Sequence, residues 1–393
     1  MNKELLTKEA QDYINAHLND DVTKIAMAKS PLPGIESREL ANQVASKKKA
    51  QKKLPTWFNT SSIYYPPALS IEQTSSEPTA AYKSGLAIGD NLVDLTGGFG
   101  VDTYFFSKKL KNVIHCEINE ELHQIATYNS SALGQENTIF LHIDGIEFLN
   151  QTHHRFNTIY IDPARRSSQG KVFMLRDCSP NVVENLDLLL EKADRVIIKT
   201  APLLDITAGL RELKNVIEIH VVSVKNECKE LLWILEKNDA GKKLKITAAA
   251  LNDKTKTFVF AHEEIKMYAP IIGALGLYLY EPDAALLKTG AFDLISAKYQ
   301  VAKLGDQTQL YTSDEFRPDF PGRIFKIEKV LSSGDLKKEQ NLTGNVIVRN
   351  YRDKAELLVK KHRIQPHDTK FLIFTQSDSV GFIVIFADIL QHY

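Results

Sequence analysis

Between residues 91 and 236 the chain alternates short apolar runs with stretches that have helical spacing. Buried strands alternating with helices are typical of a parallel sheet, because parallel neighbours need long crossover connections that are usually helical. We therefore predict an α/β fold with a doubly wound, mostly parallel, seven-stranded sheet. The strands are expected at NLVDL, NVIHCEI, TIFLHI, NTIYID, RVIIKT, EIHVVSV and LLWIL.

The segments on either side of this alternation have different patterns. The N-terminal segment has apolar residues at helical spacing, as in LLTKEAQDYINAHL. A hairpin in KLKITAAALNDKTKTFVFAHE closes the α/β part, and the tail mixes strands and helices as small ferredoxin-like α+β domains do. The predicted domains are 1–80 (helical, with a lead-in), 81–267 (α/β), 268–320 (ferredoxin-like) and 321–393 (a second small α+β domain).

Composition and charge exclude several function classes. Lys plus Arg number 49 and Asp plus Glu number 49, so any nucleic-acid site must be a local patch. No segment approaches the roughly 18 consecutive apolar residues of a membrane span. The three cysteines, Cys116, Cys178 and Cys228, fit neither a disulfide framework nor a zinc pair. We expect a cytoplasmic protein without a metal site, and no feature indicates its oligomeric state.

The stretch NLVDLTGGFGVD carries the first chemical motif, a glycine-rich turn between a strand and a helix. Glycines allow a tight turn and a close approach of a ligand to the backbone. A dinucleotide site has a third glycine where this chain has Thr103, which disfavours the alternative of a nicotinamide dehydrogenase. The pattern DxTxGxG resembles the first motif of class I S-adenosylmethionine (SAM)-dependent methyltransferases. It is formed by Asp94, Thr96, Gly98 and Gly100.

Three further acids stand at the ends of successive predicted strands. Glu117 ends the second strand, Asp144 follows the third and Asp162 follows the fourth. Carboxyl ends of parallel strands lie along one edge of a sheet, where α/β folds bind ligands. The resemblance implies that SAM binds with its ribose hydroxyls at Glu117 and its adenine near Asp144. The methionine part is expected at the turn from Asp94 to Gly100.

The turn after the fourth strand reads YIDPARR. In methyltransferases of this class that act on amino groups, the corresponding turn reads [DN]PP[YFW]. The resemblance implies that Asp162 and the carbonyl of Pro163 accept the two hydrogens of an exocyclic amine, such as guanine N2. Methyl transfer is then catalysed mainly by holding the reacting atoms close and aligned. The sequence departs from the pattern at Ala164 and Arg165, which replace a proline and a stacking aromatic residue.

Cationic side chains near this turn are candidates for contact with a nucleic acid. Arg165 and Arg166 follow the turn, and Lys199 lies in the fifth strand. Arginine and lysine both bind phosphates, and arginine also stacks on base faces, so we predict that these three residues bind an RNA substrate. The turn DPAR also resembles that of RNA uracil-C5 methyltransferases, and this resemblance implies a cysteine nucleophile after the fifth strand. The segment VIIKTAPLLD has no cysteine, so carbon methylation is disfavoured.

Two basic segments support an RNA partner. SKKKAQKKLPTWF combines lysines with Trp57 and Phe58, the mix that single-stranded RNA uses, although a solvated helix end is an equally good explanation. The tail segment RNYRDKAELLVKKHRI gathers further positive charges. Neither segment identifies the RNA.

Nearly the whole chain resembles one bacterial family, the class I methyltransferases with a THUMP-like domain. The resemblance rests on KKLPTWF, YYPPALSIEQTSSEPTAAYK, VDLTGGFGVD, YIDPARR and LLVKKHRI. It implies that residues 321–393 form the THUMP-like domain. The lead-in before the first strand also resembles the SAM-contacting lead-in of methyltransferases, which implies that Ser75 contacts SAM, although a helix N-terminus capped by Ser75 or Ser76 is an equally good explanation. The alternative is a noncatalytic RNA-binding protein that keeps the methyltransferase fold, and fold analogy alone does not decide between the two.

Overall fold

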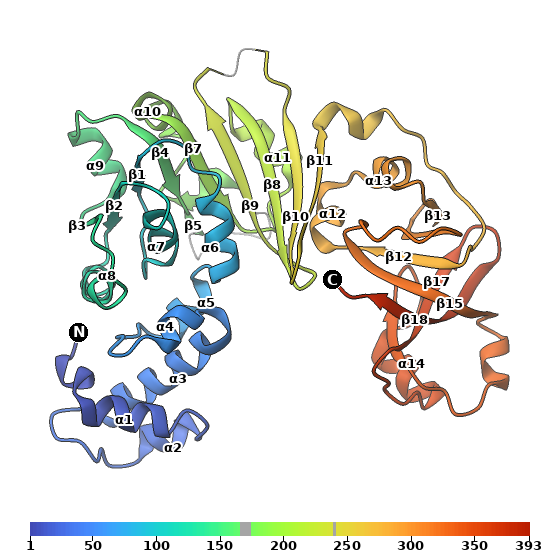
Figure 1. Ribbon diagram of the computed structural model, residues 1–393, viewed down its shortest axis with the longest axis horizontal. Coiled ribbons are helices and arrows are strands. Elements are labelled where there is room, and N and C mark those ends of the chain that lie inside the picture. The colour runs from blue at the N-terminus through green and yellow to red at the C-terminus, as the bar shows by residue number, and fades with distance from the viewer. Residues whose placement is uncertain (166–173, 239–240) are drawn as a thin grey trace. The chain divides into compact units, whose positions relative to one another are not determined.

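The computed structural model describes residues 1–165, 174–238 and 241–393, and Figure 1 shows its helices and strands. The chain divides into two compact units. Unit 1 comprises Met1–Ile217 and Leu232–Ala240, and unit 2 comprises Glu218–Leu231 and Gly241–Tyr393. The boundary passes through two strands, β8 (Val216–Val224) and β9 (Glu227–Glu236), so both units contain part of each.

The N-terminal helices share a hydrophobic core with the beginning of the α/β segment. Trp57 is buried in the same cluster as Phe99 and Ile125, which follow the first and second strands. Helix α3 begins with a capping box, in which the Glu39 carboxylate accepts the backbone N–H of Glu36. The predicted helical segment is therefore packed into unit 1. Its helices are α1 (Lys8–Ala16), α2 (Val22–Met27), α3 (Ser37–Lys53), α4 (Pro55–Asn59), α5 (Ala68–Gln73) and α6 (Glu77–Ser84).

The large sheet gives the chain a mixed α/β fold, as the alternating pattern predicted. It has nine strands in the order β11-β10-β8-β9-β7-β4-β1-β2-β3. The segment from β7 to β3 in this order is parallel, with β1 paired to both β4 and β2. These strands are β1 (Asn91–Asp94), β2 (Asn112–Glu117), β3 (Thr138–His142), β4 (Phe156–Ile161) and β7 (Ala193–Thr200).

The strand count of the large sheet differs from the predicted seven. The predicted hairpin forms β10 (Lys245–Leu251) and β11 (Thr255–Ala261), and it extends the sheet instead of only closing the domain. The hairpin extends the sheet because β10 pairs in parallel with β8, so that the hydrogen-bonded sheet continues from β8 into the hairpin. The helices that connect the strands are α7 (Val101–Ser107), α8 (Glu120–Ala132), α9 (Gly145–Gln151), α10 (Leu186–Lys192) and α11 (Ile206–Glu212).

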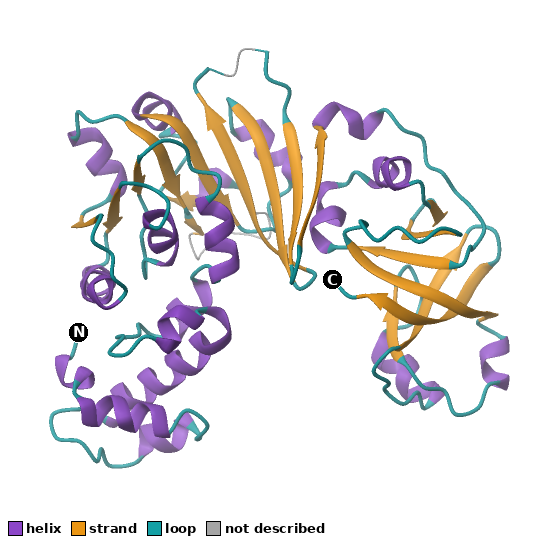
Figure 2. Cartoon of the chain, viewed as in Figure 1, coloured by secondary structure: helices purple, strands orange, loops and turns teal. Residues whose placement is uncertain are grey.

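A second sheet of seven strands lies in unit 2 (Figure 2), in the order β13-β14-β12-β15-β18-β17-β16. Strand β12 comes from the predicted 268–320 segment and pairs with β15 from the predicted 321–393 segment. Strands of both segments therefore share one sheet. They are β12 (Tyr278–Pro282), β13 (Ala302–Gly305), β14 (Thr308–Ser313), β15 (Gly322–Ser332), β16 (Asn345–Val348), β17 (Lys370–Ser377) and β18 (Gly381–Gln391).

Short elements complete the fold. A two-stranded ribbon joins β5 to β6, and it follows the end of β4 directly. Within the described ranges, no helix has the length and apolar character that crossing a membrane requires. The remaining elements are η1 (Lys3–Leu6), β5 (Ala164–Arg165), η2 (Leu175–Asp177), β6 (Cys178–Ser179), η3 (His262–Lys266), α12 (Ala284–Thr289), α13 (Phe292–Tyr299), η4 (Asp335–Lys338) and α14 (Ala355–His362).

Candidate active site

The turn after β1 depends on its glycines. Gly100 has a φ of +86°, a left-handed conformation that strains residues with a Cβ. At Gly97 a Cβ would lie 2.0 Å from Cε1 of His115, which is far inside contact distance. The turn therefore passes directly over the histidine of β2. A glycine-lined turn of this kind leaves the backbone open to a ligand.

Asp94, the last residue of β1, fixes this turn from inside. Its carboxylate is fully buried and accepts the backbone N–H of Thr96 at 3.0 Å and the hydroxyl of Thr103 at 2.7 Å. Burial raises the pKa of Asp94 to about 7. Thr103 also lies 2.9 Å from Nδ1 of His115, whose pKa is lowered to about 3 by burial, so this imidazole is neutral near pH 7. The predicted contact of Asp94 with a ligand stays a prediction.

Glu117 lies at the end of β2 and faces the glycine turn. One carboxylate oxygen accepts the backbone N–H of Gly98 and the other accepts that of Asn119, both at 2.7 Å. Each carboxylate oxygen has a second lone pair, so Glu117 retains capacity for two further donors. The next residue, Ile118, exposes 66% of its surface. An acid beside an exposed apolar side chain suits a ribose joined to an aromatic base.

Asp144 caps helix α9. One of its carboxylate oxygens accepts the backbone N–H groups of Ile146 at 2.8 Å and Glu147 at 3.0 Å, as the N-cap of a helix does. The other oxygen has no hydrogen bond among those that the structure describes. The following residue, Gly145, lies against the backbone of the glycine turn, because a Cβ there would be 2.4 Å from the carbonyl oxygen of Leu95. Asp144 is thereby placed beside the turn after β1.

Asp162 directly follows β4 and is tied to the glycine turn. Its backbone N–H donates to the hydroxyl of Thr96 at 2.7 Å. One oxygen of its carboxylate forms an ion pair with Lys199 on β7, and a third (33%) of the Asp162 side chain is exposed. Pro163 is buried. The structure therefore brings together Thr96, Asp162 and Lys199, three residues that the sequence pattern singled out separately.

The predicted roles of the two arginines fall outside what the structure describes. The backbone of Arg165 belongs to β5, and its side chain lies outside the described part. Arg166 is outside the described residues altogether. Lys199 was predicted to bind substrate, and its position against Asp162 shows that it acts on this carboxylate in the ligand-free protein.

A second group of charged side chains is buried around Asp102 of α7, and the sequence patterns did not reveal it. Asp102 of α7 accepts hydrogen bonds at 2.8 Å from Ser75 and from Tyr160, and Nζ of Lys83 lies 3.1 Å from its carboxylate. Burial favours the neutral form of Asp102, but Lys83 and Lys199 outweigh it and lower the pKa of this carboxyl. Ser75, predicted to contact SAM, is also buried and accepts from Lys83 at 2.7 Å.

The basic segment SKKKAQKKLPTWF has fewer lysines available to a nucleic acid than its sequence suggested, because several of them are paired or buried within the protein. Lys49 pairs with Glu72, and Lys53 donates to the carbonyl oxygen of Glu72 at 2.6 Å. Lys47 is largely buried, which lowers its pKa. Trp57 exposes only 1% of its surface, so the prediction of a stacking surface for RNA is wrong at this residue. The apolar spacing of the helix explains the burial, because Trp57 fills the core shared with α7 and α8.

Comparisons with known proteins place the chain among methyltransferase relatives. A crystal structure from Porphyromonas gingivalis W83, described as a "putative methyltransferase", superposes with a TM-score of 0.85. The two sequences are 29% identical, and the match covers 97% of each chain. A family model of a ferredoxin-like domain matches residues 278–321, which confirms the ferredoxin-like character predicted for this region.

Two curated relatives carry more specific names. An uncharacterized SAM-dependent methyltransferase of Mycobacterium tuberculosis is 23% identical over 301 residues, which are 75% of this chain and 77% of that protein. An uncharacterized RNA methyltransferase of Mycoplasma mobile is 31% identical over 88 residues. This second match covers 22% of the chain and only 24% of the relative's length.

Proposed function

We propose that this chain, a SAM-dependent methyltransferase like the relatives it matches, modifies RNA at an exocyclic amine of a base such as N2 of guanine. The observation that carries the proposal is the position of Asp162. This residue follows β4, is linked to the glycine turn through Thr96, and presents a partly exposed carboxylate. The name of the Mycoplasma mobile relative supports RNA as the substrate class.

The side chains at this edge of the sheet fit the cofactor. Glu117 has two lone pairs available for the ribose hydroxyls, and Ile118 offers an exposed apolar surface to the adenine ring. The free oxygen of Asp144 would accept from the adenine amino group, and the turn from Asp94 to Gly100 would receive the methionine part. SAM supplies an electrophilic methyl group on a sulfonium sulfur.

The protein's own contribution to the reaction is orientation of the amine. Lys199 holds one oxygen of Asp162, which leaves the other oxygen as an acceptor for one amine hydrogen. The carbonyl of Pro163 would accept the second hydrogen, so that the nitrogen lone pair points at the methyl group. Alignment of this kind accounts for most of the barrier reduction expected in an in-line displacement.

The same proposal extends to the architecture. We infer that residues 81–267 act as a doubly wound methyltransferase domain, after the helical segment 1–80. Residues 268–320 would form the ferredoxin-like part and residues 321–393 the THUMP-like part of one shared sheet, and the THUMP-like part would help to hold RNA. Arg165 and Arg166 would contact phosphates or a base face, and a cytoplasmic location suits an RNA substrate.

The test is nucleoside mass spectrometry of ribosomal and transfer RNA from cells with and without the gene. The proposal expects a single N-methylated nucleoside to disappear with the gene and to return when the purified protein and SAM are added. A lost nucleoside methylated on carbon would contradict the role of Asp162.

In the noncatalytic alternative, the ion pair between Lys199 and Asp162 is a structural contact that orients no amine. This alternative predicts RNA binding with no transfer of labelled methyl to RNA lacking the modification. Transfer in a single-turnover assay would exclude it.

A further inference from the structure

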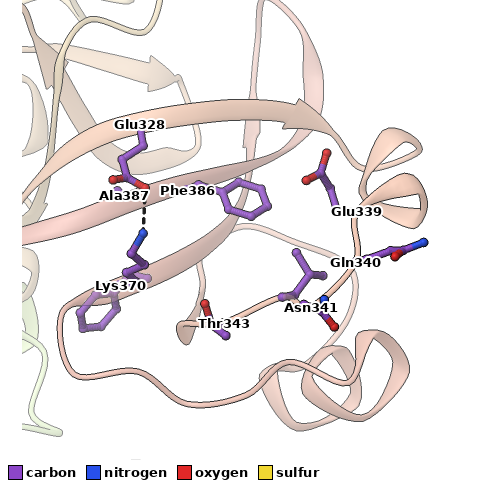
Figure 3. A pocket seen from close by; sticks show the side chains of 10 residues that line it. Glu328, Glu339, Gln340, Asn341, Thr343, Lys370, Phe386 and Ala387 are labelled. Atoms are coloured by element: carbon purple, nitrogen blue, oxygen red, sulfur yellow. Dashed lines mark ion pairs between the residues drawn. The ribbon is translucent and has the colours of Figure 1, made fainter.

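A polar cavity of about 180 Å³ opens on the seven-stranded sheet of unit 2 (Figure 3). None of the residues assigned above to the cofactor or the amine lines it. A cavity of about 150 Å³ accommodates one benzene-sized ring, so this one has room for a single planar ring system. Its walls come from β15, β17, β18 and the segment 339–343 that precedes β16.

The charges of the cavity cancel in pairs. Glu328 lies 3.6 Å from Lys370, and Glu339 lies 2.7 Å from Lys329. All four side chains are partly exposed, so each ion pair can open at small cost. A neutral cavity has no preference for an isolated cation or anion. It suits an uncharged group that carries both hydrogen-bond donors and acceptors.

A β-bulge in β15 explains why the adjacent residues Glu328 and Lys329 form ion pairs on different sides of the cavity. Ile327 pairs with Ala387 and Lys329 pairs with Phe386, so Glu328 is the extra residue in β15. Bulges re-aim side chains and are frequent beside binding sites. This bulge directs Glu328 toward Lys370 while its neighbour Lys329 pairs with Glu339.

The remaining lining offers a ring surface and open polar groups. In Figure 3 the Phe386 ring lies between Glu328 and Glu339, and Asn341 and Thr343 lie on the other side of the cavity. Within the part of the chain that the structure describes, neither Asn341 nor Thr343 has a side-chain hydrogen bond. Asn341 has a φ of +54°, a left-handed conformation that asparagine tolerates better than most residues.

We propose that this cavity binds one unpaired nucleobase of an RNA strand. The base stacks on Phe386, and its donor and acceptor edge bonds to Asn341 and Glu339. Lys370 lines the cavity and would meet an adjoining phosphate when its ion pair with Glu328 opens, while the Lys329 ammonium lies 5.9 Å from the centroid of the Phe386 ring and adds positive charge beside the stacking surface. Stacking on aromatic rings combined with nearby cations is how proteins hold single-stranded nucleic acids. The inference rests on the proposed RNA function and adds a second point of contact to it.

The test measures binding of single-stranded RNA to the full chain by fluorescence anisotropy, using pentamers of A, C, G and U as probes. Phe386→Leu keeps an apolar side chain but removes the ring, and we expect at least one pentamer to bind about fivefold more weakly. Asn341→Gly removes the amide at a backbone position that glycine adopts readily, with an expected loss of about threefold. The salt dependence of binding should not change, because no phosphate contact is removed.

A matched control is Asn215→Gly, since Asn215 also has a left-handed φ, +61°, and does not line the cavity. The control should bind all four pentamers as the unchanged protein does, and all variants should bind SAM equally in calorimetry. If Phe386→Leu lowers the stability of the protein, its RNA affinity is set aside, and the RNA affinity of Asn341→Gly alone tests the inference.

Equal RNA affinities of both cavity variants and the control would overturn the inference and leave the proposed function intact. Failure of the unchanged protein to bind any pentamer would overturn it too. Weaker RNA binding by the cavity variants, together with absence of methyl transfer, would support the cavity and refute the proposed enzyme activity.

Discussion

Replacing Lys83 by methionine should destabilise unit 1 severely. The Lys83 side chain is fully buried, and its ammonium lies 3.1 Å from Asp102. Methionine keeps most of the volume of the lysine side chain but removes the nearest cation from the buried carboxylate of Asp102, which then has only the more distant Lys199. Removing one partner of a buried ion pair costs about 3–5 kcal/mol, and the lower end applies here because Ser75 and Tyr160 still donate to Asp102.

The assay is thermal unfolding followed by circular dichroism. In a domain of this size about 1 kcal/mol corresponds to about 2–4 °C, so Lys83→Met should lower the midpoint by about 6–12 °C. The control Lys111→Met removes an exposed ion pair with Asp90 and should leave the midpoint almost unchanged. Adding Asp102→Asn to Lys83→Met should restore part of the loss, because it removes the stranded charge.

The pH dependence of the defect follows from the lowered pKa of Asp102. A lowered carboxyl pKa contributes stability above the unfolded value of about 3.9, and this stability is lost as pH falls through the folded value. In Lys83→Met the carboxyl of Asp102 loses its nearest cation, so burial raises its pKa and it binds a proton as pH falls, which relieves the penalty. The difference between Lys83→Met and the unchanged protein should therefore be smaller near pH 4 than near pH 8. A midpoint shift below about 2 °C at pH 8 would refute the reasoning.

Three further predictions concern the candidate site. Glu117→Ala should weaken SAM binding by about 2 kcal/mol in calorimetry, and unchanged affinity would mean that the acid is only structural. Asp162→Ala removes both acceptor oxygens and should reduce turnover by about 100-fold while SAM affinity stays within a few-fold; parallel losses of both would argue against an orienting role. The raised pKa of Asp94, about 7, means that its carboxyl stays protonated in the folded protein after it ionises in the unfolded chain. Stability should then fall as pH rises from about 4 to 7, and Asp94→Asn should flatten this slope in urea titrations; an unchanged slope would disprove the assignment.

The α/β part of the fold could be predicted because periodicity is a local property of the sequence. Apolar runs of strand length mark β1, β2, β4 and β7, and Asp94 and Glu117 stand at the last positions of their strands. Since parallel strands present their carboxyl ends at one edge, the order of these acids along the chain also predicts the edge where the candidate site is expected. The strand count was wrong because nothing local in the hairpin indicates that β10 pairs with β8.

The charge pairs of the site could not be read from the sequence. Lys199 and Asp162 are 37 positions apart, and Lys83 of α6 pairs with Asp102 of α7, with the whole of β1 between them along the chain. Such pairing depends on how elements pack in three dimensions, whereas periodicity reports only on faces of single elements. The one local signal that was available is Asp102 itself, an acid two positions after Gly100 at the start of a helix.

The central position of β15 has a consequence for dividing this protein into pieces. One edge of β15 pairs with β12 and the other with β18, so a cut near residue 320 separates strands that share one hydrogen-bonded sheet. Each fragment would keep an open strand edge with unpaired backbone groups, the usual starting point of aggregation. Truncation or recombination at this position would therefore yield insoluble fragments. The strands from β12 to β18 have to be kept together in any functional variant.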